Sequence, residues 1–403
     1  MTPASGMREA PRMTGALDGV RILDLSWGIA GPLGVLLLAE QGADVVKVEP
    51  PGGDPFRAYQ GYAVWNRSRR SVTVDLKRTA GLDAFGRLID EADVVVETFR
   101  PGVTDRLGIG FDALHARNPR LVYASCPAYP EGHRLAHRPG YDALVQASSG
   151  QQWEQPGWRM GPIFLHMPMP SMGAAFLLPS GILAALIARE ETGRGQHVRT
   201  SLFQGALLYT TQIWQHVEKA PAAFHDLMGK SYPPGIHQQM LFEVEGGKWV
   251  HTSVMSGLTP TKSQDELLGL EEAPDPFTFM ALPPEEREQF TVRRREAYQH
   301  HEREALVRAF QEHNHAVEAV ITMEEALGAG GAPHPQLAAN GMVVTVEDPE
   351  LGTTTQIGVP INLHGTPGAI RGPQPLPGQH NTEIFGPLGY SAEEIAAFST
   401  EVS

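Results

Sequence analysis

Cysteine is almost absent from this sequence, which has Cys126 alone among its 403 residues. No disulfide bond can form within the chain, so a reducing compartment, the cytoplasm, is the expected location. The beginning of the chain also lacks an apolar run of signal-peptide length, and we expect residues 1–15 to form a disordered tail.

Positive charge and long hydrophobic runs are scarce as well. The 32 Lys and Arg residues face 46 Asp and Glu residues, a formal net charge of −14 that disfavours nucleic acid or an anionic membrane as partner. The longest apolar run, residues 172–189, is interrupted by Pro179 and Ser180, and it is too short to predict a membrane span. The histidines show no spacing typical of a metal site, so we expect no bound metal. A soluble protein is predicted.

The same apolar run is the stretch around which the rest of the chain is expected to pack. Small and large apolar residues follow one another on every face from residue 172 to residue 188, a pattern that predicts a helix buried all round. Ser171 stands where the N-cap of this helix is expected. A loop that leads into the N-terminus of a buried helix is a suitable place for a reacting anion.

Short apolar runs alternate with helical patterns through the first part of the chain. This alternation predicts an α/β protein with a Rossmann-like, doubly wound parallel sheet. The predicted strands are residues 20–25, 43–49, 71–76, 93–97 and 121–125.

Composition changes after about residue 220, which indicates a second structural unit. Residues 221–235 are rich in Pro and Gly without periodicity, as in a linker, and Gly246-Gly247 predicts a β-hairpin. We therefore expect a large domain over residues 16–224 and a smaller inserted α+β domain over residues 225–328. Residues 329–403 are expected to return to the large domain.

Local motifs narrow the chemistry only partly. The loop SWGIAGP after the first strand has two glycines, fewer than a dinucleotide fingerprint needs. The basic run WNRSRRSVTVDLK suits a phosphate-bearing ligand, although a solvated basic edge explains it equally well. The segment around Ser171 is not a G-x-S-x-G elbow, so a Ser–His hydrolase is disfavoured.

Taken together, the segments of this chain resemble CoA-transferase family III, the CaiB/BaiF group of formyl-CoA and carnitine CoA-transferases. The resemblance covers nearly the whole chain in family order, and it implies a Rossmann-like large domain, a smaller inserted domain and an interlocked dimer. The matching segments are LDGVRILDLSWGIAGP, GADVVKVEPPGGD, NRSRRSVTVDLK, ETFRPGVTDRLGIG, NPRLVYAS, RPGYDALVQASSG, GILAALIARE, TGRGQ, GMVVTVEDPELG and GTPGAIR.

The resemblance also implies a reaction and a site. Members of the family move CoA from an acyl-CoA to a carboxylic acid through an aspartate that attacks the thioester. Here Ser171 occupies that aspartate's position, and a serine hydroxyl is a poor replacement because it is protonated at neutral pH and its ester is not readily reopened by a thiolate. Asp142 and Glu154 are the acids that remain near the site, so the candidate catalytic residues are Ser171, Asp142 and Glu154.

The binding site for CoA, which acts as substrate or product, looks retained by resemblance. The residues expected along the nucleotide are Asn66, Arg69, Arg70 and Lys77, and those expected at its adenine and phosphate end are Thr98, Phe99 and Arg106. The family often has Asn where Thr98 stands.

Four interpretations are open at the level of sequence. The chain is a CoA-transferase in which Glu154 supplies the carboxylate, or it is a subunit without a nucleophile that pairs with an Asp-bearing paralogue instead of forming a homodimer. Alternatively, it performs altered acyl-CoA chemistry of the isomerase, lyase or hydrolase type, or it binds acyl-CoA without catalysis. Acyl-CoA and a carboxylic acid are the expected partners in the transferase interpretation.

Overall fold

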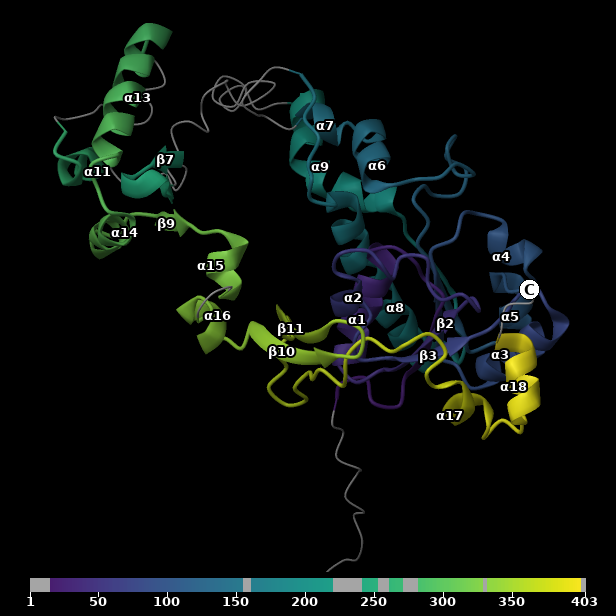
Figure 1. Ribbon diagram of the computed structural model, residues 1–403. Coiled ribbons are helices and arrows are strands. Elements are labelled where there is room, and N and C mark those ends of the chain that lie inside the picture. Colours follow the sequence, from purple (N-terminus) through teal and green to yellow (C-terminus); the bar gives the residue numbers. More distant parts are fainter. Residues whose placement is uncertain are drawn as a thin grey trace, which may run out of the picture. The chain divides into compact units, whose positions relative to one another are not determined.

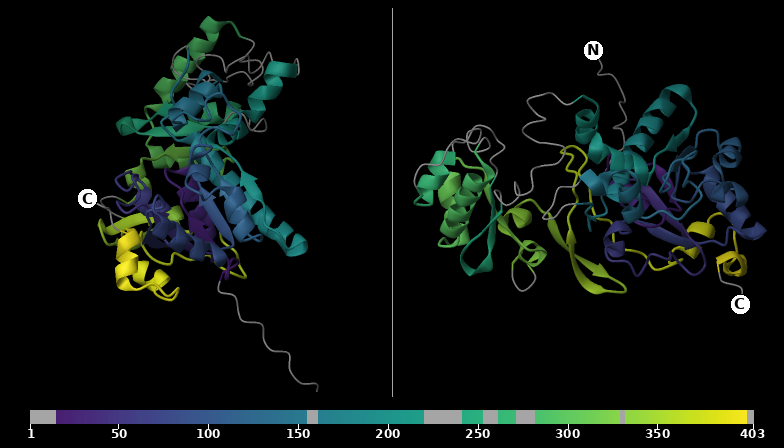
Figure 2. Two further views of the ribbon diagram at one scale, coloured as in Figure 1. Left: turned by 90° about the vertical axis from the view of Figure 1, so that its right-hand side faces the viewer. Right: turned by 90° about the horizontal axis from the view of Figure 1, so that it is seen from above.

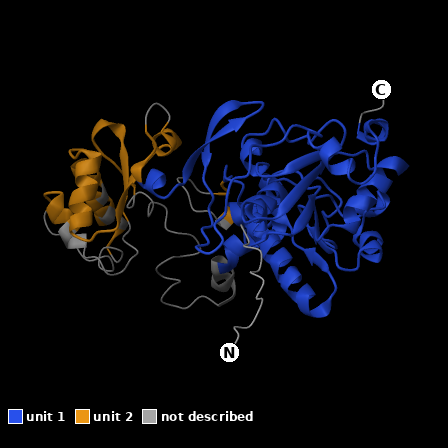
Figure 3. Ribbon diagram, turned by 90° about the horizontal axis from the view of Figure 1, so that it is seen from below, with its two compact units in different colours: residues 1–152, 164–211, 336–403 blue, residues 153–163, 212–335 orange. Residues whose placement is uncertain are grey.

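The computed structural model describes residues 15–154, 161–219, 241–252, 261–270, 282–328 and 332–399. The chain divides into two compact units, shown in blue and orange in Figure 3. The first unit comprises residues 1–152, 164–211 and 336–403, and the second comprises residues 153–163 and 212–335. The linker predicted over residues 221–235 lies outside the described residues.

The first unit is built on a six-stranded sheet in which every pair of neighbouring strands is parallel. The strand order is β3-β2-β1-β4-β5-β6, which is the order of the Rossmann fold. The α/β class and the parallel sheet predicted from the sequence are confirmed. The strands are β1 Arg21–Asp24, β2 Asp44–Glu49, β3 Arg70–Thr73, β4 Val94–Glu97, β5 Val122–Ser125 and β6 His197–Arg199.

Helices cover both faces of this sheet because alternate side chains of each strand point to opposite sides. Leu23 and Val95 belong to a core that includes residues of α3, α5, α17 and α18, whereas Ile22 and Val94 belong to a core that includes residues of α1 and α8. Figures 1 and 2 show the C-terminal helices in yellow beside the sheet. The helices are α1 Ala30–Glu40, α3 Thr79–Asp90, α5 Phe111–Arg117, α8 Met169–Thr192, α17 Asn381–Phe385 and α18 Ala392–Ser399.

Shorter elements complete the first unit. Strands β10 and β11 pair as an antiparallel hairpin. The helix α9, whose residues up to 211 belong to this unit, packs near α8, and three short helices follow strands or precede α8. These elements are α2 Tyr62–Trp65, α4 Val103–Arg106, α6 Asp142–Ser148, α9 Leu202–Lys219, β10 Val343–Asp348 and β11 Gly352–Ile357.

Helix α8 begins earlier than the sequence predicts and is not broken in its middle. Its first residue is Met169, so Ser171 lies inside the first turn and the prediction of Ser171 as N-cap is wrong. The reason is Pro170, which needs no hydrogen-bond acceptor in a first turn. The helix continues through Pro179 and is long and apolar enough to cross a membrane by composition, but half of its apolar window is buried against the core of this unit. Such burial is typical of a core helix.

Two glycines fix the first turn of α8 against α9. A Cβ atom added to Gly173 would lie 2.5 Å from the carbonyl oxygen of Gly205, and one added to Gly205 would overlap the carbonyl oxygen of Pro170. The two backbones therefore touch directly, and any larger side chain would push them apart. This contact sets the position of Ser171.

The second unit contains a three-stranded antiparallel sheet of order β7-β8-β9 with its own core, in which the rings of Phe242 and Tyr298 stack. The hairpin predicted around Gly246-Gly247 is confirmed, whereas β9 was not predicted. The elements are α7 Gln151–Glu154, β7 Leu241–Glu243, the 3₁₀ turn Glu245–Gly247, β8 Trp249–Thr252, α11 Thr261–Leu267, α13 Pro284–Tyr298, α14 Arg303–Glu312, β9 Val317–Val320, α15 Met323–Leu327 and α16 Pro335–Ala339, of which the first and last lie at the division between the units.

Candidate functional site

A cavity of about 900 Å³ opens at the carboxyl ends of β1 to β4, and we call it the sheet-edge cavity. It includes the point between β1 and β4 at which the strand order reverses, the usual ligand site of such sheets. Apolar side chains meet three cationic ones there. The lining residues are Leu25, Trp27, Val48, Glu49, Pro50, Pro51, Val74, Asp75, Leu76, Lys77, Thr98, Phe99, Arg100, Val103, Arg106, Leu107, Pro139, Gly140 and Tyr141.

Four of the seven residues predicted to bind CoA line this cavity, namely Lys77, Thr98, Phe99 and Arg106. The loop that carries Thr98 is tied to the loop after β1, because the backbone N–H of Trp27 donates to Thr98 Oγ1 over 2.8 Å and the two aromatic rings of Trp27 and Phe99 meet edge to face at 5.1 Å. Thr98 thus joins the two strands across the reversal point. Trp27 is not among the residues predicted from the sequence to bind CoA. Its position directly after a predicted strand is a signal that could have indicated it.

The other three predicted residues lie elsewhere. Asn66 is fully buried and donates to the carbonyl oxygen of Tyr62 over 3.2 Å. Arg69 is also buried and donates to Asp24 Oδ2 over 2.6 Å, and Arg70 bonds to Asp44 on the adjacent strand over 2.7 Å. The structure therefore uses Asn66, Arg69 and Arg70 within the protein and does not place them on the sheet-edge cavity.

A buried ionic cluster supports the loop after β1. Lys47 Nζ donates to the carbonyl oxygen of Ser26 over 2.8 Å and pairs with Asp54 Oδ2 at 2.9 Å, and both side chains are almost completely buried. The hydroxyl of Ser26 donates in turn to Asp24, the partner of Arg69. A charged cluster of this kind fixes Trp27 at the mouth of the cavity, because each member loses a partner if the loop moves.

Ser171 and Asp142 form a pair of hydrogen bonds at the start of α8. The backbone N–H of Ser171 donates to Asp142 Oδ1 over 2.8 Å, and the hydroxyl of Ser171 donates to Asp142 Oδ2 over 2.7 Å. Burial raises the pKa of the Asp142 carboxyl above its ordinary value, and the two bonds from Ser171 oppose that rise. Glu154 is the last residue of α7, and its side chain lies outside the described residues.

Comparison with known proteins decides the family. Residues 17–381 match the family described as CoA-transferase family III. The chain belongs to this family. It is 32% identical to formyl-CoA:oxalate CoA-transferase of Streptomyces coelicolor over 94% of this chain and 97% of that protein. The family resemblance found in the sequence is thereby confirmed.

Two further similarities agree. The chain is 38% identical to acetyl-CoA:oxalate CoA-transferase of Acetobacter aceti over a segment that spans 52% of this chain and 57% of that protein. The crystal structure of Rv3272 from Mycobacterium tuberculosis is similar with a TM-score of 0.74 and 27% identity, over 92% of this chain and 99% of that one. The fold of this family III chain is thus that of a solved relative.

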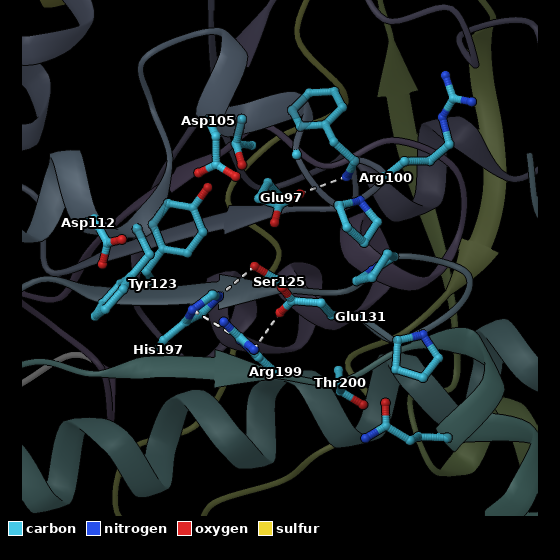
Figure 4. Close-up of a pocket in the computed structure, with 18 residues that line it drawn as sticks. Glu97, Arg100, Asp105, Asp112, Tyr123, Ser125, Glu131, His197, Arg199 and Thr200 are labelled. Carbon is cyan, nitrogen blue, oxygen red and sulfur yellow. Dashed lines mark hydrogen bonds and ion pairs between the residues drawn. The ribbon is translucent and has the colours of Figure 1, made fainter. Parts of the chain in front are cut away.

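A second cavity of about 430 Å³ lies beside the first in this family III protein, at the ends of β4, β5 and β6. Figure 4 shows Glu97, Ser125 and His197 pointing toward one another in it. Arg199 Nε donates to His197 Nδ1 over 3.2 Å, so the imidazole proton is on Nε2 and is donated to Ser125 Oγ over 2.8 Å. The Ser125 side chain opposes the rise in the pKa of Glu97 that burial causes.

The direction of these bonds is opposite to that of a nucleophilic serine–histidine pair. A catalytic histidine accepts the proton of its serine, whereas His197 donates to Ser125. Burial, together with Arg199, also lowers the pKa of His197 to about 4, so the ring stays neutral at neutral pH. The pair therefore does not provide a nucleophile.

Glu97 should make the stability of the protein depend on pH. Burial raises the pKa of Glu97 from 4.5 to about 7, so the folded state holds this proton more tightly than the unfolded state. Its stabilising contribution is therefore complete below pH 4.5 and is lost as the pH rises through 7. Relative to Glu97→Gln, we expect the free energy of unfolding of the natural protein to fall by about 3 kcal/mol over that range. Urea unfolding of both proteins from pH 5 to 8 checks this, and a difference independent of pH would contradict it.

Within the described residues, no group of three or more His, Cys, Asp or Glu side chains is arranged to hold a metal ion.

Proposed function

We propose that this protein transfers CoA between an acyl-CoA and a carboxylic acid, with the CoA bound in the sheet-edge cavity. The observation that carries the proposal is this cavity of about 900 Å³ at the reversal point of a family III chain, lined by Lys77, Phe99 and Arg106. The names of two relatives agree with it, since one uses formyl-CoA with oxalate and another acetyl-CoA with oxalate.

The charges and rings of the cavity suit the parts of CoA. Lys77 follows β3 and Arg106 belongs to α4, and neither forms an ion pair with another described residue. Both are available to the phosphates, and Phe99 and Trp27 offer faces for the adenine ring. The thioester end is then directed toward Gly140 and Tyr141, next to Asp142.

We further propose that the working form is a cytoplasmic, interlocked homodimer. Helices α8 and α9 expose large apolar side chains in the single chain, among them Phe176 at 58%, Ile187 at 73% and Leu208 at 49%. Exposed apolar side chains on neighbouring helices are typical of a subunit interface.

A second candidate function rests on Ser171. If this residue stands at the position of the family's nucleophilic aspartate, as the sequence resemblance implies, the chain would act as the non-nucleophilic subunit beside an Asp-bearing paralogue. Purification of the protein from its own host tests this candidate. A strictly homodimeric product excludes it.

The transfer assay itself tests the main proposal. The purified chain is incubated with a panel of acyl-CoAs and a panel of carboxylic acids, and the thioesters are separated by chromatography. We expect a new acyl-CoA whose acyl group comes from the added acid, together with the free donor acid. A panel in which every donor remains unchanged would contradict the proposal.

A further inference from the structure

We propose that Asp142 is the nucleophile of this protein, in place of a carboxylate at position 171. The inference rests on the proposed transfer function. It starts from the two hydrogen bonds at the N-terminus of α8, which place the Asp142 carboxylate 2.7 Å from the hydroxyl oxygen of Ser171. A carboxylate is therefore present within one hydrogen-bond length of the place where the family resemblance puts one.

Burial shows which of the two side chains a substrate reaches. Ser171 is 3% exposed, whereas Asp142 is partly exposed and accepts a bond from the serine hydroxyl. The two residues that precede Asp142, Gly140 and Tyr141, line the sheet-edge cavity. A thioester that enters from the cavity therefore meets the carboxylate before it meets the hydroxyl.

The N-terminus of α8 favours the ionised form of Asp142, whereas burial disfavours it. The N–H of Ser171 belongs to the first turn of the 24-residue helix α8, whose N-terminus favours negative charge. Each carboxylate oxygen accepts one bond from Ser171, and the carboxylate keeps lone-pair capacity for reaction. Burial raises the pKa of Asp142, which makes its carboxylate a stronger nucleophile than an exposed one.

A carboxylate nucleophile also allows the catalytic cycle to be completed. A serine ester would not be readily reopened by the CoA thiolate. An oxygen of Asp142 attacks the thioester carbonyl, the C–S bond breaks, and a mixed anhydride and CoA thiolate form. The thiolate then attacks the Asp142 carbonyl carbon, which releases the donor acid as its carboxylate and leaves an Asp142–CoA thioester. The acceptor carboxylate attacks this thioester and displaces the thiolate, giving a second anhydride. The thiolate finally takes the acceptor acyl group and frees Asp142, with no net change in protons or electrons.

Ser171 acts in this scheme as a positioning residue. Its hydroxyl orients one oxygen of Asp142 and lowers the pKa of that carboxyl. Ser171→Ala should therefore retain transfer within about tenfold of the natural rate, because the backbone N–H remains. The acid limb of its pH–rate profile should move to higher pH, a change that a purely structural role would not produce.

Hydroxylamine trapping tests the assignment on the natural protein. Hydroxylamine converts an enzyme-bound anhydride or thioester into a hydroxamate, and digestion with mass spectrometry locates it. We expect the label on Asp142 only when acyl-CoA is present. Asp142→Asn should lose the label and at least about 10³-fold in transfer rate. Asp83→Asn, an exposed carboxylate on α3, should leave both unchanged.

The outcomes separate this inference from the function on which it rests. Transfer with the label on Glu154 or another residue would overturn the assignment of Asp142 and leave the transferase function standing. Transfer at the natural rate by Asp142→Asn would do the same. No transfer by the chain alone would overturn both, and recovery on addition of an Asp-bearing paralogue would establish the second candidate function.

Discussion

Replacing Lys77 and Arg106 together with alanine is expected to weaken CoA binding by roughly 10²- to 10⁴-fold. A hydrogen bond between a cationic side chain and a phosphate contributes about 1.5–3 kcal/mol, and the double variant loses two. The two side chains line the cavity from the β3 side and from α4, so neither can replace the other. Calorimetric titration with CoA measures the change.

Two comparisons make this binding experiment specific. Pantetheine thioesters lack the nucleotide, so the natural protein and the double variant should bind them equally well. Arg120→Ala removes an exposed cation that precedes β5, at the opposite edge of the sheet, and should leave CoA binding unchanged. CoA binding by the double variant as tight as that of the natural protein would show that the nucleotide lies elsewhere.

Arg67→Met is expected to destabilise the first unit by about 3–5 kcal/mol, the usual cost of leaving one member of a buried ion pair alone. Arg67 is fully buried and pairs with Glu40 Oε1 at 2.6 Å. It also donates to Gln356 Oε1 over 3.0 Å and to the carbonyl oxygen of Ile357 over 2.7 Å. One side chain thus joins α1 to β11, which are far apart in the sequence.

Urea unfolding followed by tryptophan fluorescence measures this loss, since Trp27 and Trp65 belong to the first unit. Arg67→Met with Glu40→Leu should recover much of the stability, because the remaining carboxylate is then removed as well. Arg117→Met breaks an exposed pair with Asp90 and should cost less than about 1 kcal/mol. A loss for Arg67→Met as small as that for Arg117→Met would contradict a structural role for the buried pair.

The sequence predicts the sheet well because parallel strands covered on both faces are short apolar runs. It predicts the role of the basic run poorly, because that role depends on partners that are distant in the chain. Arg69 pairs with Asp24 and Arg70 with Asp44 and Glu383, and nothing in the run itself indicates which cation will be buried. A basic run beside a strand therefore indicates a ligand only after its internal partners are known.

The candidate site likewise has one part that the sequence predicts and one part that it does not. Lys77, Thr98, Phe99 and Arg106 follow strands, and the carboxyl ends of parallel strands meet at one edge, so their placement on one cavity follows from the topology. The contact between Ser171 and Asp142 depends instead on where α8 begins and on the close approach of α8 and α9 at Gly173. That three-dimensional contact has no sequence pattern, and only the structure reveals it.

The most direct test of this account is the rate at which the purified natural chain, without any partner, transfers CoA from an acyl-CoA to a carboxylic acid, measured beside Ser171→Asp. We expect transfer by the natural chain, because Asp142 already supplies a carboxylate beside Ser171. No transfer by the natural chain, together with transfer by Ser171→Asp, would contradict it and would show a site that lacks only its nucleophile.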